Sequence, residues 1–176
     1  MIRTNGRPSD LNGRLDKEIQ TYDFLDSLGI SYQRVDHPPV MTMEECDRID
    51  MVLEAPPCKN LLLCNKKKTD FYLMLMPAQK SFKASELSKQ ILSPRLSFAS
   101  GESMEELLNL TPGSLTIMGL LNDKEHRVKV LIDREVLEHK YLGCHPCVNT
   151  ATIRFTTKDL TEKILPAMDH KAIFIH

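Results

Sequence analysis

The sequence lacks several features that would assign a protein to a large functional class. It has no apolar run approaching the roughly 18 residues that a membrane-spanning helix needs. It contains neither the glycine-rich pattern of dinucleotide-binding folds nor the glycine-rich, lysine-ending loop of P-loop proteins. Its net charge is only −1 at pH 7, which argues against extensive contact with a polyanion, because such binding grows with the number of phosphates neutralised.

The first residues also lack the apolar core of a signal peptide, and we expect a cytoplasmic protein. We expect residues 1–14 to be a polar lead-in and residues 15–176 to form a single domain, since a chain of this length can bury one hydrophobic core. Without an export signal, the five cysteines, an odd number, are expected to be reduced thiols and not a disulfide framework.

The most concentrated positive charge lies at Lys66, Lys67 and Lys68, between two apolar segments. A charge run in such a place is usually the solvated tip of a hairpin. A local footprint for phosphate at this tip stays open as the alternative.

The pattern of apolar residues predicts helices and strands in irregular alternation, which indicates an α+β fold. We expect helices over 15–30, 42–53, 83–92, 103–110 and 157–168. We expect strands over 31–37, 58–65, 70–77, 95–100, 113–121, 127–133, 150–156 and 171–176. The runs 58–65 and 70–77 are almost continuously apolar, which is typical of central strands covered on both faces. Thr42 and Glu45 fit a capping box at the start of the second helix.

The stretch YLGCHPCVNTATIRF holds two cysteines and a histidine within four residues. A structural zinc site usually draws four ligands from two paired clusters, and the chain has only one C-x-x-C. A redox C-x-x-C begins a helix, whereas the residues after Cys147 favour a strand. Neighbours on an extended chain point in different directions, so Cys144 and His145 are poor evidence for a nucleophilic pair. We therefore expect no metal.

The same stretch has the composition of a stiff loop. Gly143 can adopt a positive φ angle, and Pro146 has a fixed φ angle and no N–H group. Because His145 precedes Pro146, its backbone is restricted to extended conformations. We expect His145 on a rigid loop at the start of a strand, either as a structural histidine or as a site residue.

Two further candidates are Lys59 and the turn around Gly113. Alternation along its strand places Lys59 on the same face as Leu61. The ammonium group of Lys59 either extends outward to solvent or points into a pocket, where it could hold a phosphate or an oxyanion. At the turn, Gly113 would let the backbone approach a ligand closely, with nearby N–H groups as donors.

Taken in this order, these segments resemble the YbaK/ProX family of aminoacyl-tRNA deacylases. The resemblance is strongest to the free-standing alanyl-tRNA(Pro) deacylases related to the editing domain of bacterial prolyl-tRNA synthetase. It covers about residues 15–172. The matching segments are 36–45, 58–63, 111–123 and 143–153. One departure is Ile117, which stands where the family pattern has a proline.

The resemblance implies a mixed, largely antiparallel, barrel-like sheet flanked by helices. It implies hydrolysis of the ester that joins a mischarged amino acid to the terminal adenosine of tRNA, without metal or cofactor. The catalytic residues that it implies are Lys59, His145 and Gly143. The substrate-binding residues that it implies are Asn60, Gly113, Ser114, Cys144, Pro146, Asn149 and Thr150.

The implied substrate is mischarged tRNA(Pro), most of all alanyl-tRNA(Pro), held by its acceptor end, and prolyl-tRNA synthetase is a further candidate partner. No membrane partner is expected. Lys59 would hold a phosphate or polarise the acyl end, and N–H groups near Gly113 or Gly143 would stabilise the oxyanion. His145 would shape the pocket or act as a base. The alternatives are a deacylase for cysteine or serine and a non-catalytic tRNA-binding or synthetase-binding module.

Overall fold

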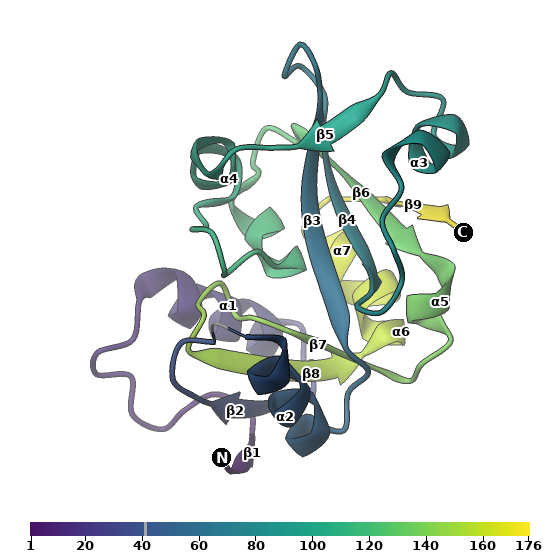
Figure 1. The fold of residues 1–176 in the computed structure, drawn as a ribbon. Helices are drawn as coiled ribbons and strands as arrows, with labels where there is room; N and C mark the ends of the chain where they lie inside the picture. The colour runs from purple at the N-terminus through teal and green to yellow at the C-terminus, as the bar shows by residue number, and fades with distance from the viewer. Residues whose placement is uncertain (41) are drawn as a thin grey trace.

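Two open β-sheets form the framework of the computed structural model, which describes residues 1–40 and 42–176 (Figure 1). Met41, inside the matching segment 36–45, lies outside the described residues. The first sheet has the order β1 (Arg3–Asn5), β2 (Gln33–Asp36), β8 (Ala151–Thr156) and β7 (Tyr141–Cys144). The second has the order β5 (Leu96–Phe98), β3 (Cys58–Asn65), β4 (Phe71–Pro77), β6 (Val128–Asp133) and β9 (Ala172–Ile175).

The strand pairing is mixed and largely antiparallel, as predicted. All pairs in the first sheet are antiparallel, and so are the pairs of β3 with β4 and β5. Among the strands of the described residues, only the pairs of β4 with β6 and of β6 with β9 are parallel. The α+β class is therefore confirmed, with the strands divided between two open sheets and not closed into one barrel.

The helices surround these sheets (Figure 1). They are α1 (Asp16–Ser27), α2 (Met43–Leu53), α3 (Ala84–Gln90), α4 (Gly101–Leu108), α5 (Arg134–Leu137), and the consecutive α6 (Thr157–Asp159), η2 (Leu160–Ile164) and α7 (Leu165–Ala167). At the start of α2, the Thr42 hydroxyl accepts a hydrogen bond from the Glu45 N–H and the Glu45 carboxylate accepts one from the Thr42 N–H, so the capping box is confirmed. No helix in the described part of the chain has both the length and the hydrophobicity needed to cross a membrane.

Strands β3 and β4 are the centre of the second sheet, and both of their faces are covered. Leu62 and Leu73 face the main core, which also contains Tyr22 and Leu25 of α1. Residues of the other face pack under α3 in a second cluster of apolar side chains. Double coverage explains why these two strands are apolar at successive positions and do not alternate with polar residues.

The predicted strand over 113–121 is wrong. This segment ends in a 3-10 helix, η1 (Ile117–Asn122), whose first turn is capped by the Thr116 hydroxyl accepting from the Met118 N–H. A Cβ atom at Gly119 would lie 2.5 Å from Cδ1 of Leu110, so the helix packs too closely for a side chain there. A short apolar run is compatible with either structure, and tertiary packing decides between them.

Two strands arise where none was predicted. Arg3–Asn5, inside the expected polar lead-in, form β1 and pair with β2. Tyr141–Cys144 form β7, which pairs with β8 and brings the Cys-His-Pro-Cys segment into the turn between them. No helix follows Cys147, in agreement with the expected strand. The run Lys66–Lys68 is the exposed turn between β3 and β4, as predicted.

Candidate active site

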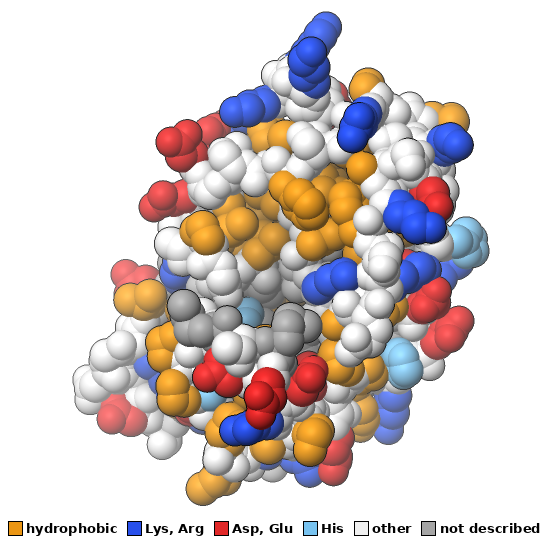
Figure 2. All heavy atoms as spheres, viewed as in Figure 1, with side chains coloured by type: hydrophobic (Ala, Val, Ile, Leu, Met, Phe, Trp, Pro, Cys, Tyr) orange, Lys and Arg blue, Asp and Glu red, His pale blue; other side chains and the backbone are white. Residues whose placement is uncertain are grey.

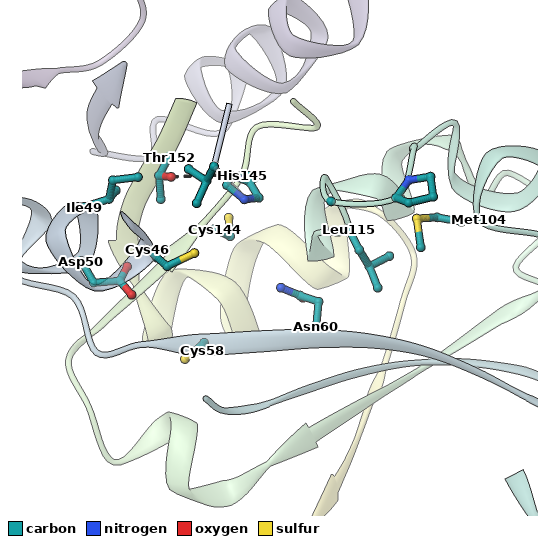
Figure 3. Close-up of a pocket in the computed structure, with 14 residues that line it drawn as sticks. Cys46, Ile49, Asp50, Cys58, Asn60, Met104, Leu115, Cys144, His145 and Thr152 are labelled. Atoms are coloured by element: carbon teal, nitrogen blue, oxygen red, sulfur yellow. Dashed lines mark hydrogen bonds between the residues drawn. The ribbon is translucent and has the colours of Figure 1, made fainter. Parts of the chain in front are cut away.

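A cavity of about 380 Å³ lies between the two sheets, where β3 of one approaches β7 and β8 of the other (Figure 3). In the space-filling view, a hollow lies in the middle of one face, with apolar side chains above it and acidic side chains below it (Figure 2). Its lining comes from six separate segments of the chain: Val40, Cys46, Ile49, Asp50, Cys58, Asn60, Met104, Pro112, Gly113, Leu115, Gly143, Cys144, His145 and Thr152.

The imidazole of His145 is held in one tautomer by its neighbours. Its Nδ1 lies 2.9 Å from the carbonyl oxygen of Ala151, which can only accept a hydrogen bond. Nδ1 therefore carries the proton, and Nε2 is left as an acceptor for a ligand in the cavity. Burial lowers the pKa of His145, so the ring is neutral at physiological pH.

A second histidine supports this arrangement. His37 Nδ1 lies 2.8 Å from the carbonyl oxygen of Pro38, so by the same reasoning its Nε2 accepts from the Thr152 hydroxyl, 2.9 Å away. The Thr152 oxygen lies 3.5 Å from His145 Nδ1, and the two imidazole rings are 6.1 Å apart. The backbone carbonyl of His145 accepts from the Thr116 hydroxyl at 2.7 Å. The loop and its imidazole are thus fixed before any ligand arrives.

Three thiols form much of the cavity wall. Cys144 is 5% exposed, and burial raises its pKa to about 12. Burial likewise raises the pKa of Cys58 to about 12 and raises the pKa of Cys46. At neutral pH all three are protonated, which makes them apolar wall groups and not nucleophiles. Cys147 is buried in the main core, where its sulfur accepts a hydrogen bond from the Thr21 hydroxyl.

Gly143 lines the cavity but does not adopt the positive φ angle that the sequence suggested. It lies within β7, and in the turn that follows it is Cys147 that takes the left-handed conformation, with φ of 63°. A Cβ atom at Gly143 would lie 3.4 Å from Cβ of Ala55 and 3.5 Å from Oδ1 of Asp50. Both are ordinary van der Waals distances, so a methyl group here would fit and would lie against the Asp50 carboxylate, which the glycine leaves uncovered.

Asn60 and Gly113 bring hydrogen-bonding groups to the cavity. Figure 3 shows the Asn60 amide directed from β3 toward the space between Cys144 and Leu115. The Asn60 Oδ1 atom is buried and has no hydrogen-bond partner among the described residues. Gly113 has a φ of 90°, and a Cβ atom there would lie 3.3 Å from the Asn149 amide. Only glycine fits this turn without strain.

Four of the predicted substrate-binding residues lie outside the cavity lining. Asn149 instead makes two hydrogen bonds to the backbone of Val40. Its Oδ1 accepts from the Val40 N–H at 3.0 Å, and its Nδ2 donates to the Val40 carbonyl at 3.1 Å. The Ser114 hydroxyl donates to the Thr111 carbonyl at 2.8 Å, inside its own turn. The Thr150 carbonyl accepts from the His37 N–H at 3.0 Å, and Pro146 is buried. These residues shape the site without facing it.

The expectation that the Lys59 ammonium points into the site is not met. Strand alternation turns Cys58 and Asn60 toward the cavity and Lys59 to the opposite face, together with Leu61 as predicted. There its ammonium donates to the carbonyls of Ala78 and Lys80, at 3.0 and 2.6 Å. Lys59 therefore ties the turn after β4 to β3.

Helix α2 supplies residues that the sequence reasoning missed. Cys46, Ile49 and Asp50 stand at positions i, i+3 and i+4, so they share the helix face that turns to the cavity. Burial, with a smaller contribution from the charge of Asp47, raises the pKa of Asp50 to about 7. The available signal was an acid on the apolar face of a predicted amphipathic helix. Among the described residues, no group of three or more His, Cys, Asp or Glu side chains could hold a metal ion.

A family model and the similar proteins of known sequence all point to one family, that of the aminoacyl-tRNA editing domains. The family model described as "Aminoacyl-tRNA editing domain" matches residues 37–163. The prolyl-tRNA editing protein ProX of Acetoanaerobium sticklandii is 35% identical over 143 residues, covering 81% of this chain and 87% of that protein. The prolyl-tRNA synthetase associated domain-containing protein 1 of Danio rerio is 31% identical over 163 residues, covering 92% and 86%.

The fold comparison agrees with the sequence comparison. A solved structure of a proposed trans-editing enzyme for prolyl tRNA synthetase superimposes with a TM-score of 0.68 at 16% identity. The match covers 91% of this chain and 96% of that chain. At this identity the likeness supports the fold alone.

Proposed function

The chain belongs to the aminoacyl-tRNA editing domain family and is an aminoacyl-tRNA deacylase, and from that premise we propose that it hydrolyses mischarged tRNA(Pro), mainly alanyl-tRNA(Pro). We propose residues 15–176 as the editing unit. The observation that supports this substrate is the cavity. Thiol and aliphatic side chains line it, together with the neutral His145 imidazole and the Asn60 amide. The names of the similar proteins, a prolyl-tRNA editing protein and a prolyl-tRNA synthetase associated protein, support tRNA(Pro) as the carrier.

The reaction needs no covalent intermediate, because an aminoacyl ester is already activated. A water molecule attacks the carbonyl carbon, the bond to the ribose oxygen breaks, and the ribose hydroxyl leaves with a proton. In this proposal His145 Nε2 accepts a hydrogen bond from the attacking water or from the neighbouring ribose hydroxyl, since Nδ1 is committed to Ala151. The fixed tautomer orients the water at no cost during the reaction.

The developing oxyanion needs donors that are already in place. We assign the Asn60 Nδ2 group as one donor because the amide enters the cavity and donates to no other group among the described residues. The backbone around Gly113 is the second candidate, since its turn lies at the cavity edge. Lys59 acts indirectly in this scheme, by holding the turn after β4 beside the strand that carries Asn60.

Selection of alanine is proposed to be steric. The aminoacyl side chain would meet an apolar wall made of Ile49, Leu115 and the protonated thiols of Cys46, Cys58 and Cys144. Such a sieve accepts alanine and rejects proline, which matches the need of a synthetase that cannot exclude a smaller amino acid by binding alone. Cysteine and serine are close to alanine in size and remain the alternative substrates.

The proposal is tested with tRNA(Pro) charged separately with alanine, cysteine, serine and proline. Purified protein is added to each, and release of the amino acid is followed. We expect fastest release of alanine and none of proline above the spontaneous rate. Tight binding of all four without release would instead support a non-catalytic tRNA-binding module. A pull-down with prolyl-tRNA synthetase, with and without tRNA, tests the proposed synthetase partner.

A further inference from the structure

Asp50 is a half-buried acid in the cavity wall for which the mechanism above gives no role. It projects from α2 between the walls formed by Cys46 and Ile49, and Figure 3 shows it on the side of the cavity opposite Asn60 and Leu115. Among the described residues, no hydrogen bond or ion pair reaches its carboxylate. The charge that acts on its pKa is that of Asp47, which is repulsive. The neighbouring cations are engaged elsewhere: Arg48 pairs with Glu44, and Arg154 with Glu54.

The position of this carboxylate relative to the reaction centre is well defined. Its Oδ1 lies against the backbone of Gly143, two residues before His145, at 3.5 Å from where a Cβ atom would be. A side chain on residue 143 would cover the carboxylate, whereas glycine leaves it open to the cavity. Asp50, Asn60 and His145 line one cavity, so a ligand whose ester carbonyl lies near Asn60 and His145 can place its adjacent α-carbon groups toward Asp50.

Every aminoacyl ester carries one cation in that place, the α-ammonium group. Resting on the proposed deacylase function, we propose that Asp50 binds the α-ammonium group of the aminoacyl substrate and so selects free aminoacyl esters over N-acylated ones. An unpaired, partly desolvated carboxylate is stabilised by an arriving cation, and the pairing fixes the ester carbonyl between Asn60 and His145. Asp50 is thus assigned as a substrate-binding residue that determines specificity.

Burial of an unpaired acid has a measurable signature in the free protein. The groups that face Asp50 are Asp47 on its own helix and the protonated thiols of Cys46 and Cys58. None of them is a cation, so the pKa of Asp50 stays raised, at about 7. An acid whose folded pKa is raised lowers the stability of the folded state as pH rises from its unfolded pKa, about 4, to its folded pKa, about 7. Asp50→Asn should therefore raise Tm more at pH 8 than at pH 5, and a cooperative transition would show that the variant folds.

The test compares alanyl-tRNA(Pro) with N-acetyl-alanyl-tRNA(Pro), which has the same ester and side chain but no cation. We expect the wild-type protein to prefer the free amine by about 30-fold or more in kcat/KM, since losing one member of a desolvated charge pair costs 2 kcal/mol or more. Asp50→Asn should lower kcat/KM for alanyl-tRNA(Pro) by a similar factor and leave the acetylated substrate unchanged. Glu44→Gln, an exposed acid on the same helix, is the matched control and should behave as wild type.

Two further outcomes separate the failure modes. If Asp50→Asn slows both substrates equally, or if the wild-type protein does not discriminate between them, the assignment of Asp50 is wrong while the deacylase stands. If the wild-type protein hydrolyses neither substrate, the proposed function itself fails. As a second variant, Gly143→Ala should reduce the preference for the free amine, because its methyl group would lie over the Asp50 carboxylate.

Discussion

At the scale of single residues, the chemistry of the site is set by which hydrogen bonds are already used. His145 gives its one N–H to Ala151, so it meets a ligand only as an acceptor. The Asn60 Oδ1 atom has no hydrogen-bond partner among the described residues, and burial keeps the Cys144 thiol protonated. The sequence could predict His145, Gly143 and Cys144, because a glycine, a proline and a histidine in one turn have local consequences. It could not predict Asp50 or Thr152, because their role depends on which elements pack against them.

Replacing His145 tests its role as the acceptor. We expect His145→Ala to lower kcat for alanyl-tRNA(Pro) by roughly 100-fold or more, the usual contribution of a positioned acid–base group. Because burial lowers the pKa of His145, the wild-type rate should not fall through protonation of this residue until the pH is below 6.5. The exposed His139 supplies the control, His139→Ala, which should keep the wild-type rate. Equal rates for both variants would remove His145 from the mechanism.

Replacing Asn60 tests the oxyanion donor. Asn60→Asp has nearly the same shape but replaces the amide donor with an acceptor. Loss of one such donor typically lowers kcat by about 100-fold to 1,000-fold, and we expect a loss of that size with little change in KM. Steady-state kinetics on alanyl-tRNA(Pro) would measure it. A change confined to KM would mean that Asn60 binds the ground state and does not stabilise the oxyanion.

At the scale of elements, the long apolar strands were easier to predict than the short strands that pair with their neighbours' edges. β3 and β4 are long, apolar and joined by a charged turn, so their hairpin follows from local pattern. β1 and β7 are short and polar or mixed, and they exist because β2 and β8 offer them hydrogen-bonding edges. The predicted strand 113–121 instead leads into the 3-10 helix η1, in which Gly119 packs closely against Leu110. Such outcomes depend on tertiary contacts that a single sequence does not display.

Lys59 gives a prediction for the β3–β4 edge. Its ammonium donates to two carbonyls of the turn after β4, so Lys59→Met should lower the free energy of unfolding by about 1–3 kcal/mol. Urea unfolding measures this loss, with Lys66→Met at the exposed hairpin turn as the control. Full loss of deacylation with no loss of stability would mean that Lys59 contacts the substrate directly.

The turn before η1 gives a prediction about selectivity. Leu115 extends from this turn into the cavity (Figure 3). Leu115→Ala should widen the sieve and reduce the preference for alanyl-tRNA(Pro) over prolyl-tRNA(Pro) by at least about tenfold, the effect expected of a few methylene groups. Leu92→Ala, at a residue that is 93% exposed, should leave the preference unchanged. If Leu115→Ala kept the wild-type preference for alanyl-tRNA(Pro) over prolyl-tRNA(Pro), Leu115 would not be part of the steric selection.

At the scale of the whole molecule, the site exists because two sheets meet. β3 carries Asn60 from one sheet, while β7 and β8 bring Gly143, His145 and Thr152 from the other, and α2 closes the side with Asp50. Local patterns predicted most of these elements but not the faces that they turn to one another. Lys59 shows why the face matters. Its neighbours along the strand face the cavity, whereas its own ammonium lies on the opposite face and donates to the turn after β4.

The proposed deacylation is tested most directly by the rate of amino-acid release from alanyl-tRNA(Pro) and from prolyl-tRNA(Pro), with the purified protein and no added metal. We expect rapid hydrolysis of the alanyl ester and no hydrolysis of the prolyl ester above the spontaneous rate. Equal hydrolysis of both esters, or of neither, would contradict it.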